Sequence, residues 1–145
     1  MNMVTQLLYS AVMATTLAAT AHADAPARTI FSCQTASGKV VNISNAGATL
    51  RYTYGRPNAA ADLNFLVPRA DTSIHDGGDD VGSGSWTMTS EVTLHFNGVT
   101  YTGWWSFNRS NQEEAGGIRV ARGAKILAET PCKSDVTMNL GAYRH

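Results

Sequence analysis

Residues 90–109 read S-E-V-T-L-H-F-N-G-V-T-Y-T-G-W-W-S-F-N-R, and this stretch decides the fold class. Two runs in which apolar and polar residues alternate flank Asn97-Gly98. This dipeptide tolerates the positive φ angles of a two-residue type I′ turn. The stretch therefore predicts a long β-hairpin, in which the turn fixes which residues face each other.

The predicted register gives the hairpin one apolar and one polar face. The pairs on the apolar face are Phe96 with Val99, Leu94 with Tyr101, Val92 with Gly103, and Ser90 with Trp105. The pairs on the polar face are His95 with Thr100, Thr93 with Thr102, and Glu91 with Trp104. Trp104 on a polar face is typical of a binding hot spot, because a rigid indole buries a large area at little entropic cost. The alternative is that Trp104 covers a small cluster or fills a barrel, whereas Trp86 and Trp105 are expected in the core.

The rest of the chain continues the β pattern. Short alternating runs cover residues 29–34, 39–44, 50–54, 63–67, 118–122 and 125–130, and Gly- or Asn-rich turns separate many of them. No segment after residue 23 keeps a helical period. The pattern predicts an all-β domain, a single antiparallel barrel or sandwich of about eight to nine short strands.

The N-terminus has the form of a signal peptide. Leu7 to Ala19 is a run of apolar and small residues, and Ala21-His22-Ala23 has the small-x-small pattern that precedes signal-peptidase cleavage. We therefore expect a signal peptide over 1–23, a flexible leader over 24–28, a β domain over 29–132 and a C-terminal tail over 133–145. The expected location is periplasmic or secreted, with no membrane span.

Cysteine usage and charge limit the function classes. Cys33 and Cys132 are the two cysteines, and an even number in an exported chain predicts a disulfide. Eleven basic and eleven acidic residues give a formal net charge of zero. Nucleic-acid binding and membrane-surface binding both need a basic excess, so neither is indicated.

Residues 69–85 lack hydrophobic periodicity and are expected to form a long loop. Such loops tend to be functional or mobile. The segment contains Asp76-Gly77-Gly78-Asp79-Asp80, in which calcium binding and a simply solvated acidic loop are alternatives, although the EF-hand template fails. No cofactor is expected, and the scattered histidines predict no zinc site. Together with Trp104 of the hairpin, residues of this segment form the predicted binding site. The predicted binding residues are Asp76, Asp79, Asp80, Ser83, Trp86 and Trp104.

No catalytic site is legible. Gly82-Ser83-Gly84-Ser85-Trp86 does not supply the nucleophile elbow G-x-S-x-G. The remaining enzymatic alternative is a hydrolase in which Asp79 and Asp80 pair with Glu91 or Glu113.

Several short motifs carry a resemblance. They are Phe31-Ser32-Cys33, Gly38-Lys39, Tyr54-Gly55, Val67-Pro68, Ala115-Gly116-Gly117-Ile118 and the late Cys132. With them the chain resembles small exported bacterial proteins of unknown function, and it is distantly similar to periplasmic inhibitors of C-type lysozymes. Those inhibitors are small antiparallel barrels that insert a Ser-Gly-Ala-Arg-Tyr-like loop into the enzyme's cleft. Here the nearest stretch, Ser83-Gly84-Ser85-Trp86, lacks the Arg and the Tyr.

These observations favour a non-catalytic exported binding module, with a cell-wall hydrolase such as lysozyme as the candidate target. An acidic segment suits a basic protein partner, because complementary charge raises the association rate. The alternatives are a small-molecule carrier with its ligand inside the barrel, and the hydrolase described above.

Overall fold

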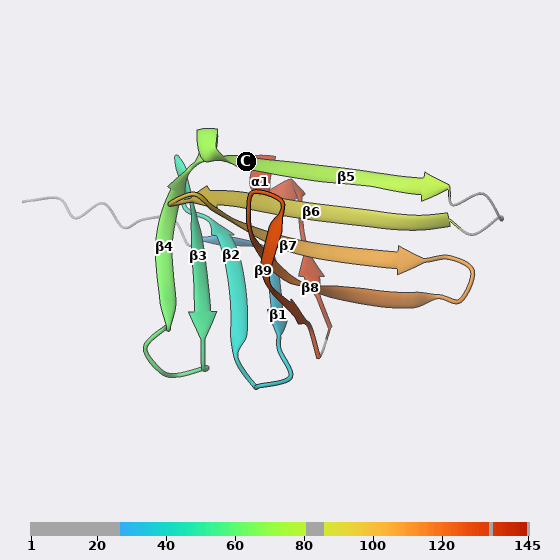
Figure 1. Ribbon diagram of the computed structural model, residues 1–145, viewed down its shortest axis with the longest axis horizontal. Coiled ribbons are helices and arrows are strands. Elements are labelled where there is room, and N and C mark those ends of the chain that lie inside the picture. The colour runs from blue at the N-terminus through green and yellow to red at the C-terminus, as the bar shows by residue number, and fades with distance from the viewer. Residues whose placement is uncertain (1–26, 81–85, 134, 145) are drawn as a thin grey trace, which may run out of the picture.

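Two antiparallel five-stranded sheets make up the fold (Figure 1). The computed structural model describes residues 27–80, 86–133 and 135–144, and of Asp79 and Asp80 it describes the backbone only. The expected signal peptide lies outside the described residues. The prediction of an all-β chain is confirmed, and the arrangement is a sandwich of ten strands.

The first sheet is built mainly from the N-terminal half of the chain. Its strand order is β10-β1-β2-β3-β4. The bounds are β1 (Arg28–Gln34), β2 (Val40–Asn45), β3 (Thr49–Gly55), β4 (Leu63–Pro68) and β10 (Thr137–Met138). Gly38 and Gly47 have φ angles of 79° and 82° in the two turns that separate β1, β2 and β3, which a glycine adopts without steric cost.

The second sheet follows the chain order β5-β6-β7-β8-β9. Its bounds are β5 (Thr72–Asp80), β6 (Trp86–Phe96), β7 (Val99–Asn108), β8 (Glu113–Arg122) and β9 (Lys125–Pro131). A 3-10 helix, η1 (Arg69–Asp71), connects the two sheets, and a short helix, α1 (Gly141–Arg144), follows β10. No helix in the described part of the chain has the length and apolar character needed to cross a membrane.

The central hairpin has the predicted register. Strands β6 and β7 pair Phe96 with Val99, Val92 with Gly103 and Glu91 with Trp104. Asn97 and Gly98 have φ angles of 50° and 73°, as a type I′ turn requires. The alternation between the turn and Ser90 therefore set the pairing correctly.

The prediction that residues 69–85 form a loop is wrong over Thr72–Asp80. This segment is edge strand β5, which pairs along its whole length with β6, from Thr72 opposite Leu94 to Asp80 opposite Trp86. An edge strand pairs through its backbone and needs no apolar alternation where its side chains meet solvent. The long β6 supplies that backbone template, and with β5 and the C-terminal β10 the number of strands is ten.

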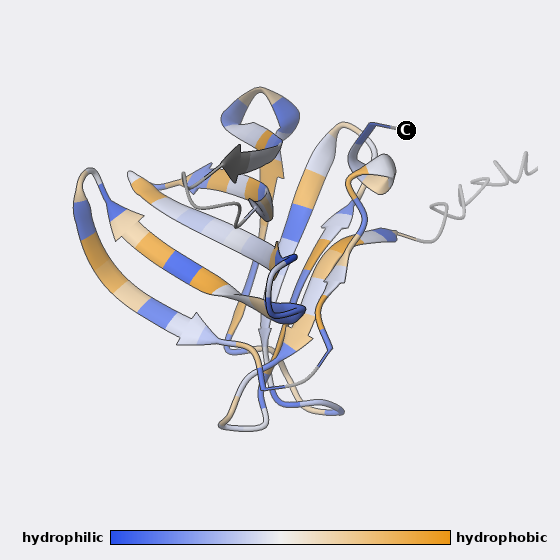
Figure 2. Ribbon diagram, turned by 90° about the vertical axis from the view of Figure 1, so that its right-hand side faces the viewer, coloured by the Kyte–Doolittle hydropathy of each residue, from blue (hydrophilic) through white to orange (hydrophobic). Residues whose placement is uncertain are grey.

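The hydrophobic core lies where the two sheets overlap. Figure 2 shows apolar and polar bands alternating along the strands, and Figure 1 shows the strands of one sheet running across those of the other. The largest fully enclosed side chains come from both sheets and are Phe31, Ile30, Ile43, Leu50, Tyr52 and Leu94. These side chains occupy the space between the two sheets.

The far halves of β5–β8 extend past the first sheet (Figure 1). We call this part of the second sheet the overhang. On its inner side, residues that continue the core-facing rows of β6 and β7, such as Met88 and Phe107, are only half-buried. The overhang therefore leaves an uncovered stretch of a sheet face whose other half is core.

The predicted disulfide between Cys33 and Cys132 is confirmed, with a Cα–Cα distance of 5.7 Å. Cys33 lies in β1 and Cys132 directly follows β9, so the bond joins the two sheets. An isolated bridge pairs Thr35 with Cys132, and Lys133 N donates to Gln34 O at 2.7 Å. The cross-link therefore sits in a local patch of inter-sheet backbone pairing.

The segment after Cys132 packs onto the core. Asn139 N donates to Ile30 O at 2.7 Å, and the buried Asn45 side chain donates to Ala142 O at 2.8 Å. Arg69 donates to the carbonyl of Tyr143 and lies over its ring. This segment thus forms the edge of the first sheet beside β1.

We predict an alkaline loss of stability that depends on Tyr52. Burial raises the pKa of its hydroxyl, and the neighbouring Tyr101 and Tyr54 add to the effect. The folded state therefore keeps this proton at pH values where the unfolded chain, with a tyrosine pKa of about 10, loses it. Stability from this group is present below pH ~10 and falls as the pH rises further.

The variant Tyr52→Phe removes that proton and is expected to show a smaller difference in the free energy of unfolding between pH 7 and about pH 11. Urea unfolding at the two pH values measures it. An alkaline loss of the same size in both proteins would contradict the assignment.

Candidate functional site: a groove beneath the overhang

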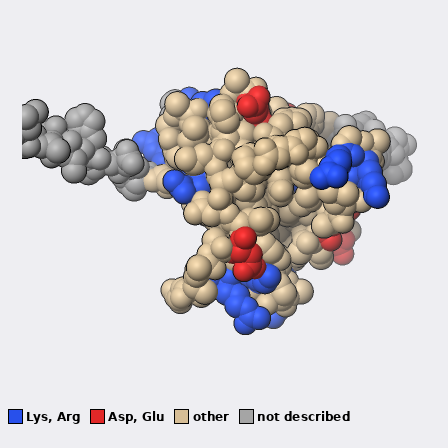
Figure 3. Space-filling model, turned by 60° about the vertical axis from the view of Figure 1, so that its left-hand side comes forward, with Lys and Arg blue, Asp and Glu red and all other residues tan. Residues whose placement is uncertain are grey.

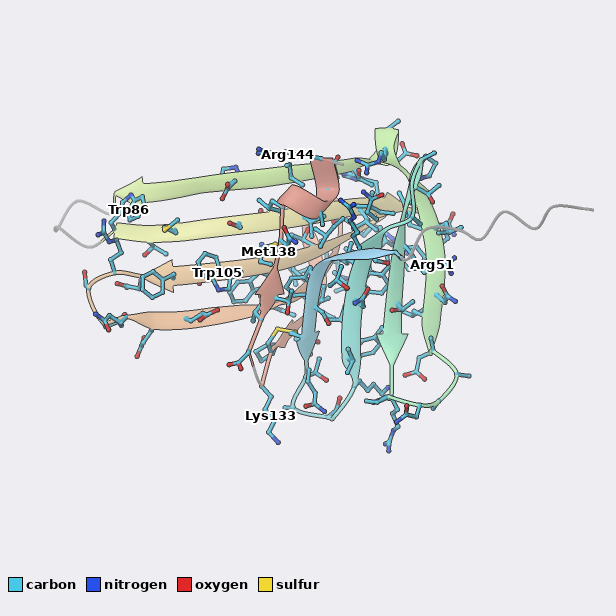
Figure 4. The ribbon with its side chains drawn as sticks, turned by 180° about the vertical axis from the view of Figure 1, so that it is seen from behind. Arg51, Trp86, Trp105, Lys133, Met138 and Arg144 are labelled. Atoms are coloured by element: carbon cyan, nitrogen blue, oxygen red, sulfur yellow. A yellow bond between two sulfur atoms is a disulfide. The ribbon has the colours of Figure 1, made fainter. Side chains whose placement is uncertain are left out.

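A groove of about 320 Å³ lies where the overhang meets the C-terminal segment. Its lining residues come from β5, β6, β7, β8 and the stretch around β10, and they are Asp76, Ser90, Trp105, Glu114, Val136, Met138 and Leu140. Figure 4 shows Trp105 on β7 and Met138 on β10 close together, with Trp86 at the far end of the overhang. Two segments that are distant in sequence thus form one surface hollow.

The base of the groove is a row of paired residues across the second sheet. Asp76 pairs with Ser90, Ser90 with Trp105, and Trp105 with Gly116. Because side chains opposite each other share a face of the sheet, Asp76, Ser90 and Trp105 all lie on the inner side. At Gly116 an added Cβ would lie 2.6 Å from Val136 Cγ2. The absence of a side chain at Gly116 is therefore what lets the C-terminal segment close this side of the groove.

The Trp105 indole is held by a carboxylate. Its Nε1 donates to Glu114 Oε1 at 2.5 Å, and its ring is nearly parallel to that of Phe107, with 6° between the planes and 6.3 Å between centroids. Trp105 is half-buried and Glu114 is exposed. The hydrogen bond fixes the orientation of the indole.

A second carboxylate stands on the opposite side of the groove. Asp76 Oδ1 accepts a hydrogen bond of 2.8 Å from Ser90 Oγ. The ion pairs within the described chain are Lys39–Asp62, Arg119–Glu91 and Arg119–Glu129. Asp76 thus accepts a hydrogen bond from the neutral Ser90, and Glu114 accepts one from the neutral Trp105. Neither carboxylate has a cationic partner among the described residues.

The far end of the overhang carries a second tryptophan. Trp86 lies over Gly78, where an added Cβ would be only 2.5 Å from the indole. The guanidinium carbon of Arg109 lies 5.4 Å from the centre of a Trp86 ring. Together with the half-buried Met88, Trp105 and Phe107, Trp86 forms what we call the overhang face.

The outer side of the same sheet has a different character. The Trp104 indole lies against Gly117, where an added Cβ would be 3.1 Å from Nε1. This Nε1 is enclosed and has no hydrogen-bond partner among the residues that the structure describes. Arg119 lies 3.9 Å from Glu91 and 3.1 Å from Glu129. Trp104 therefore packs on its own sheet within a polar surface.

The structure divides the predicted binding residues between two faces. Asp76 and Trp86 lie on the inner side with the groove, whereas Trp104 lies on the outer side. Asp79 and Asp80 contribute backbone to β5, opposite Thr87 and Trp86, and Ser83 lies outside the described residues.

The expectation that Trp86 and Trp105 belong to the core is wrong. Both lie on the face that elsewhere is core, but both are half-buried because the first sheet does not reach them. Trp105, Glu114 and Met138 were missed as site residues. A signal was present, since the predicted register places Trp105 opposite Ser90, a polar residue that a buried face does not hold without a partner.

The hydrolase alternative pairs Asp79 and Asp80 with Glu91 or Glu113. The structure describes only the backbone of the two aspartates, so the pairing of these carboxylates lies outside what it describes. Glu91 is engaged with Arg119, and Glu113 accepts a 2.8 Å hydrogen bond from Asn111. In the described residues, no three His, Cys, Asp or Glu side chains cluster in a way that would hold a metal ion.

Comparisons with protein-family models, with curated proteins and with solved structures found no match to this chain.

Proposed function

We propose that this chain is a non-catalytic exported binding module that takes a segment of a protein partner into the groove and along the overhang face. The observation that carries the proposal is the row of half-exposed Trp, Met and Phe side chains on a rigid sheet, next to a preformed hollow. Trp, Phe and Met are enriched at the centres of protein interfaces, where they contribute large buried areas.

The shape of the site favours a polypeptide over a small molecule held inside the fold. The space between the sheets is filled by side chains such as Phe31 and Leu94, both 0% exposed. The groove lies at the surface instead and continues into the overhang face towards Trp86 (Figure 4). A ligand that covers both needs the length of a peptide segment.

The groove chemistry supports binding rather than catalysis. Ser90 Oγ donates a hydrogen bond to Asp76 Oδ1, so the serine faces a carboxylate and not an imidazole. The neighbouring His75 pairs with Glu91, which places it on the opposite side of the sheet. An activated serine requires a base within hydrogen-bond reach, which His75 does not provide here.

Charge and covalent structure agree with an exported protein that meets other proteins. The disulfide suits an oxidising compartment. Lys, Arg, Asp and Glu form small separate groups on the face seen in Figure 3, without a continuous basic patch. Among exported partners, cell-wall hydrolases such as lysozyme are the class to test first.

The test compares two adjacent tryptophans on opposite faces of β7. We expect Trp105→Ala to weaken partner binding by about 30-fold, as for a hot spot worth about 2 kcal/mol. Trp104→Ala is the matched control and is expected to leave affinity unchanged. Calorimetric titration against purified C-type lysozyme and other cell-wall hydrolases, with an activity assay alongside, measures both.

Two results would count against this proposal. One is the absence of binding by the wild-type protein throughout that panel. The other is a loss of affinity in Trp104→Ala with none in Trp105→Ala, which would move the interface to the outer face. Thermal melts of both variants show whether either change acts by unfolding.

A further inference from the structure

We infer that the groove receives an arginine side chain of the partner, with its guanidinium between Asp76 and Glu114 beside the Trp105 indole. This inference rests on the proposed function and specifies the chemistry of the segment that binds. It starts from the two carboxylates, which have no cationic partner among the described residues.

The carboxylates are oriented but not neutralised. Ser90 holds Oδ1 of Asp76, and Trp105 holds Oε1 of Glu114. The second oxygen of each carboxylate makes no hydrogen bond to the described part of the chain. Each carboxylate therefore keeps a free acceptor oxygen at the groove.

The two acids place carboxylates on two sides of the groove. Asp76 lies on β5 and Glu114 on β8, with β6 and β7 between them. They consequently approach the groove from opposite sides. A guanidinium presents five N–H donors in a plane and is weakly hydrated, whereas a lysine ammonium is a compact, strongly hydrated point charge.

The other two surfaces of the groove match the rest of an arginine side chain. The indole of Trp105 offers an aromatic surface of the kind on which guanidinium groups stack. Val136, Met138 and Leu140 form an apolar wall that suits the three methylenes of the stem. Acidic sides, an aromatic base and an aliphatic wall together describe a site for this one side chain.

The experiment uses the full mature protein and short capped peptides as probes. Ac-Gly-Arg-Gly-NH₂ is compared with its citrulline and lysine counterparts, following the Trp105 indole N–H in ¹⁵N NMR spectra. We expect saturable shifts with the arginine peptide, at least about tenfold weaker binding with citrulline and weaker binding with lysine. The affinity is expected to fall as salt is added.

Matched variants locate the interaction. Glu114→Gln keeps an amide oxygen that accepts from Trp105 Nε1 but removes the charge, and Asp76→Asn does the same beside Ser90. Each is expected to weaken arginine-peptide binding about tenfold. Glu113→Gln is the control, because Glu113 pairs with Asn108 on the other face and is expected to have no effect.

The outcomes separate this inference from the proposed function. Equal binding of arginine and citrulline peptides, or equal effects of Glu113→Gln and Glu114→Gln, would overturn the arginine assignment. Equal binding of the lysine peptide would do so too. If partner affinity still depends on Trp105 in those cases, the binding module stands and only the identity of the inserted side chain falls.

Discussion

Replacing both Cys33 and Cys132 with alanine is expected to lower the free energy of unfolding by about 4 to 5 kcal/mol. The two cysteines are 99 positions apart, so the bond closes most of the β domain into one loop. In the chain-entropy model, closing a loop of about 100 residues is worth about 4.7 kcal/mol at 25 °C. Such a loss is large against the 5 to 15 kcal/mol that stabilises a typical domain.

Because the disulfide joins the two sheets, its loss is expected to destabilise the whole domain and not only the residues around it. It links β1 of the first sheet to the end of β9 in the second, at the edge from which the chain continues into the groove wall. Urea unfolding of the oxidised protein, the reduced protein and the double variant measures the effect. The reduced wild type separates the cross-link from the loss of two sulfur atoms, and an unfolding midpoint that reduction leaves unchanged would contradict this expectation.

The second large effect is expected at Phe31. Its side chain is 0% exposed and packs where β1 crosses β7, so Phe31→Ala is expected to cost about 3 to 5 kcal/mol. The contact partner is Gly103, at which an added Cβ would lie 2.7 Å from Phe31 Cγ and 3.2 Å from Ile43 Cδ1. Gly103→Ala alone is therefore expected to cost about 1 to 3 kcal/mol by overpacking.

The two changes should compensate each other in part. In Phe31→Ala the ring is gone, and the methyl group that Gly103→Ala adds then has space, so the double variant is expected to lose less than the sum of the single losses. A double-mutant cycle by chemical denaturation measures this coupling. Ser106→Ala, on the outer side of β7, is the control and should stay within about 0.5 kcal/mol. Strict additivity would show that Phe31 and Gly103 do not pack as described.

The central hairpin was predictable because all of its determinants are local. Asn97-Gly98 fixes the turn, and alternation fixes the faces, so each pair from Phe96–Val99 to Ser90–Trp105 follows from the chain alone. The disulfide was predictable for a different reason, since two cysteines allow one pairing. Neither conclusion needed knowledge of what lies across the sheet.

Strand β5 was missed because its pairing is imposed by its neighbour. Gly77, Gly78 and three aspartates have low intrinsic strand propensity, and no apolar alternation marks the segment. The backbone of β6 nevertheless pairs with it as far as Asp80. The segment after Cys132 was missed in the same way, because its Val136, Met138 and Leu140 acquire a role only by lying against the groove.

By itself the sequence determined the class of fold, the hairpin register, the disulfide and the sides of the sheet on which Trp104 and Trp105 lie. Only the tertiary structure decided which parts of those sides are buried. The first sheet covers the inner side at Leu94 and ends before Trp105, so one continuous row of residues is core at one end and groove at the other. The alternation of apolar and polar residues shows which side of a strand each residue faces. Burial depends on how far a second sheet, distant in sequence, extends across that side.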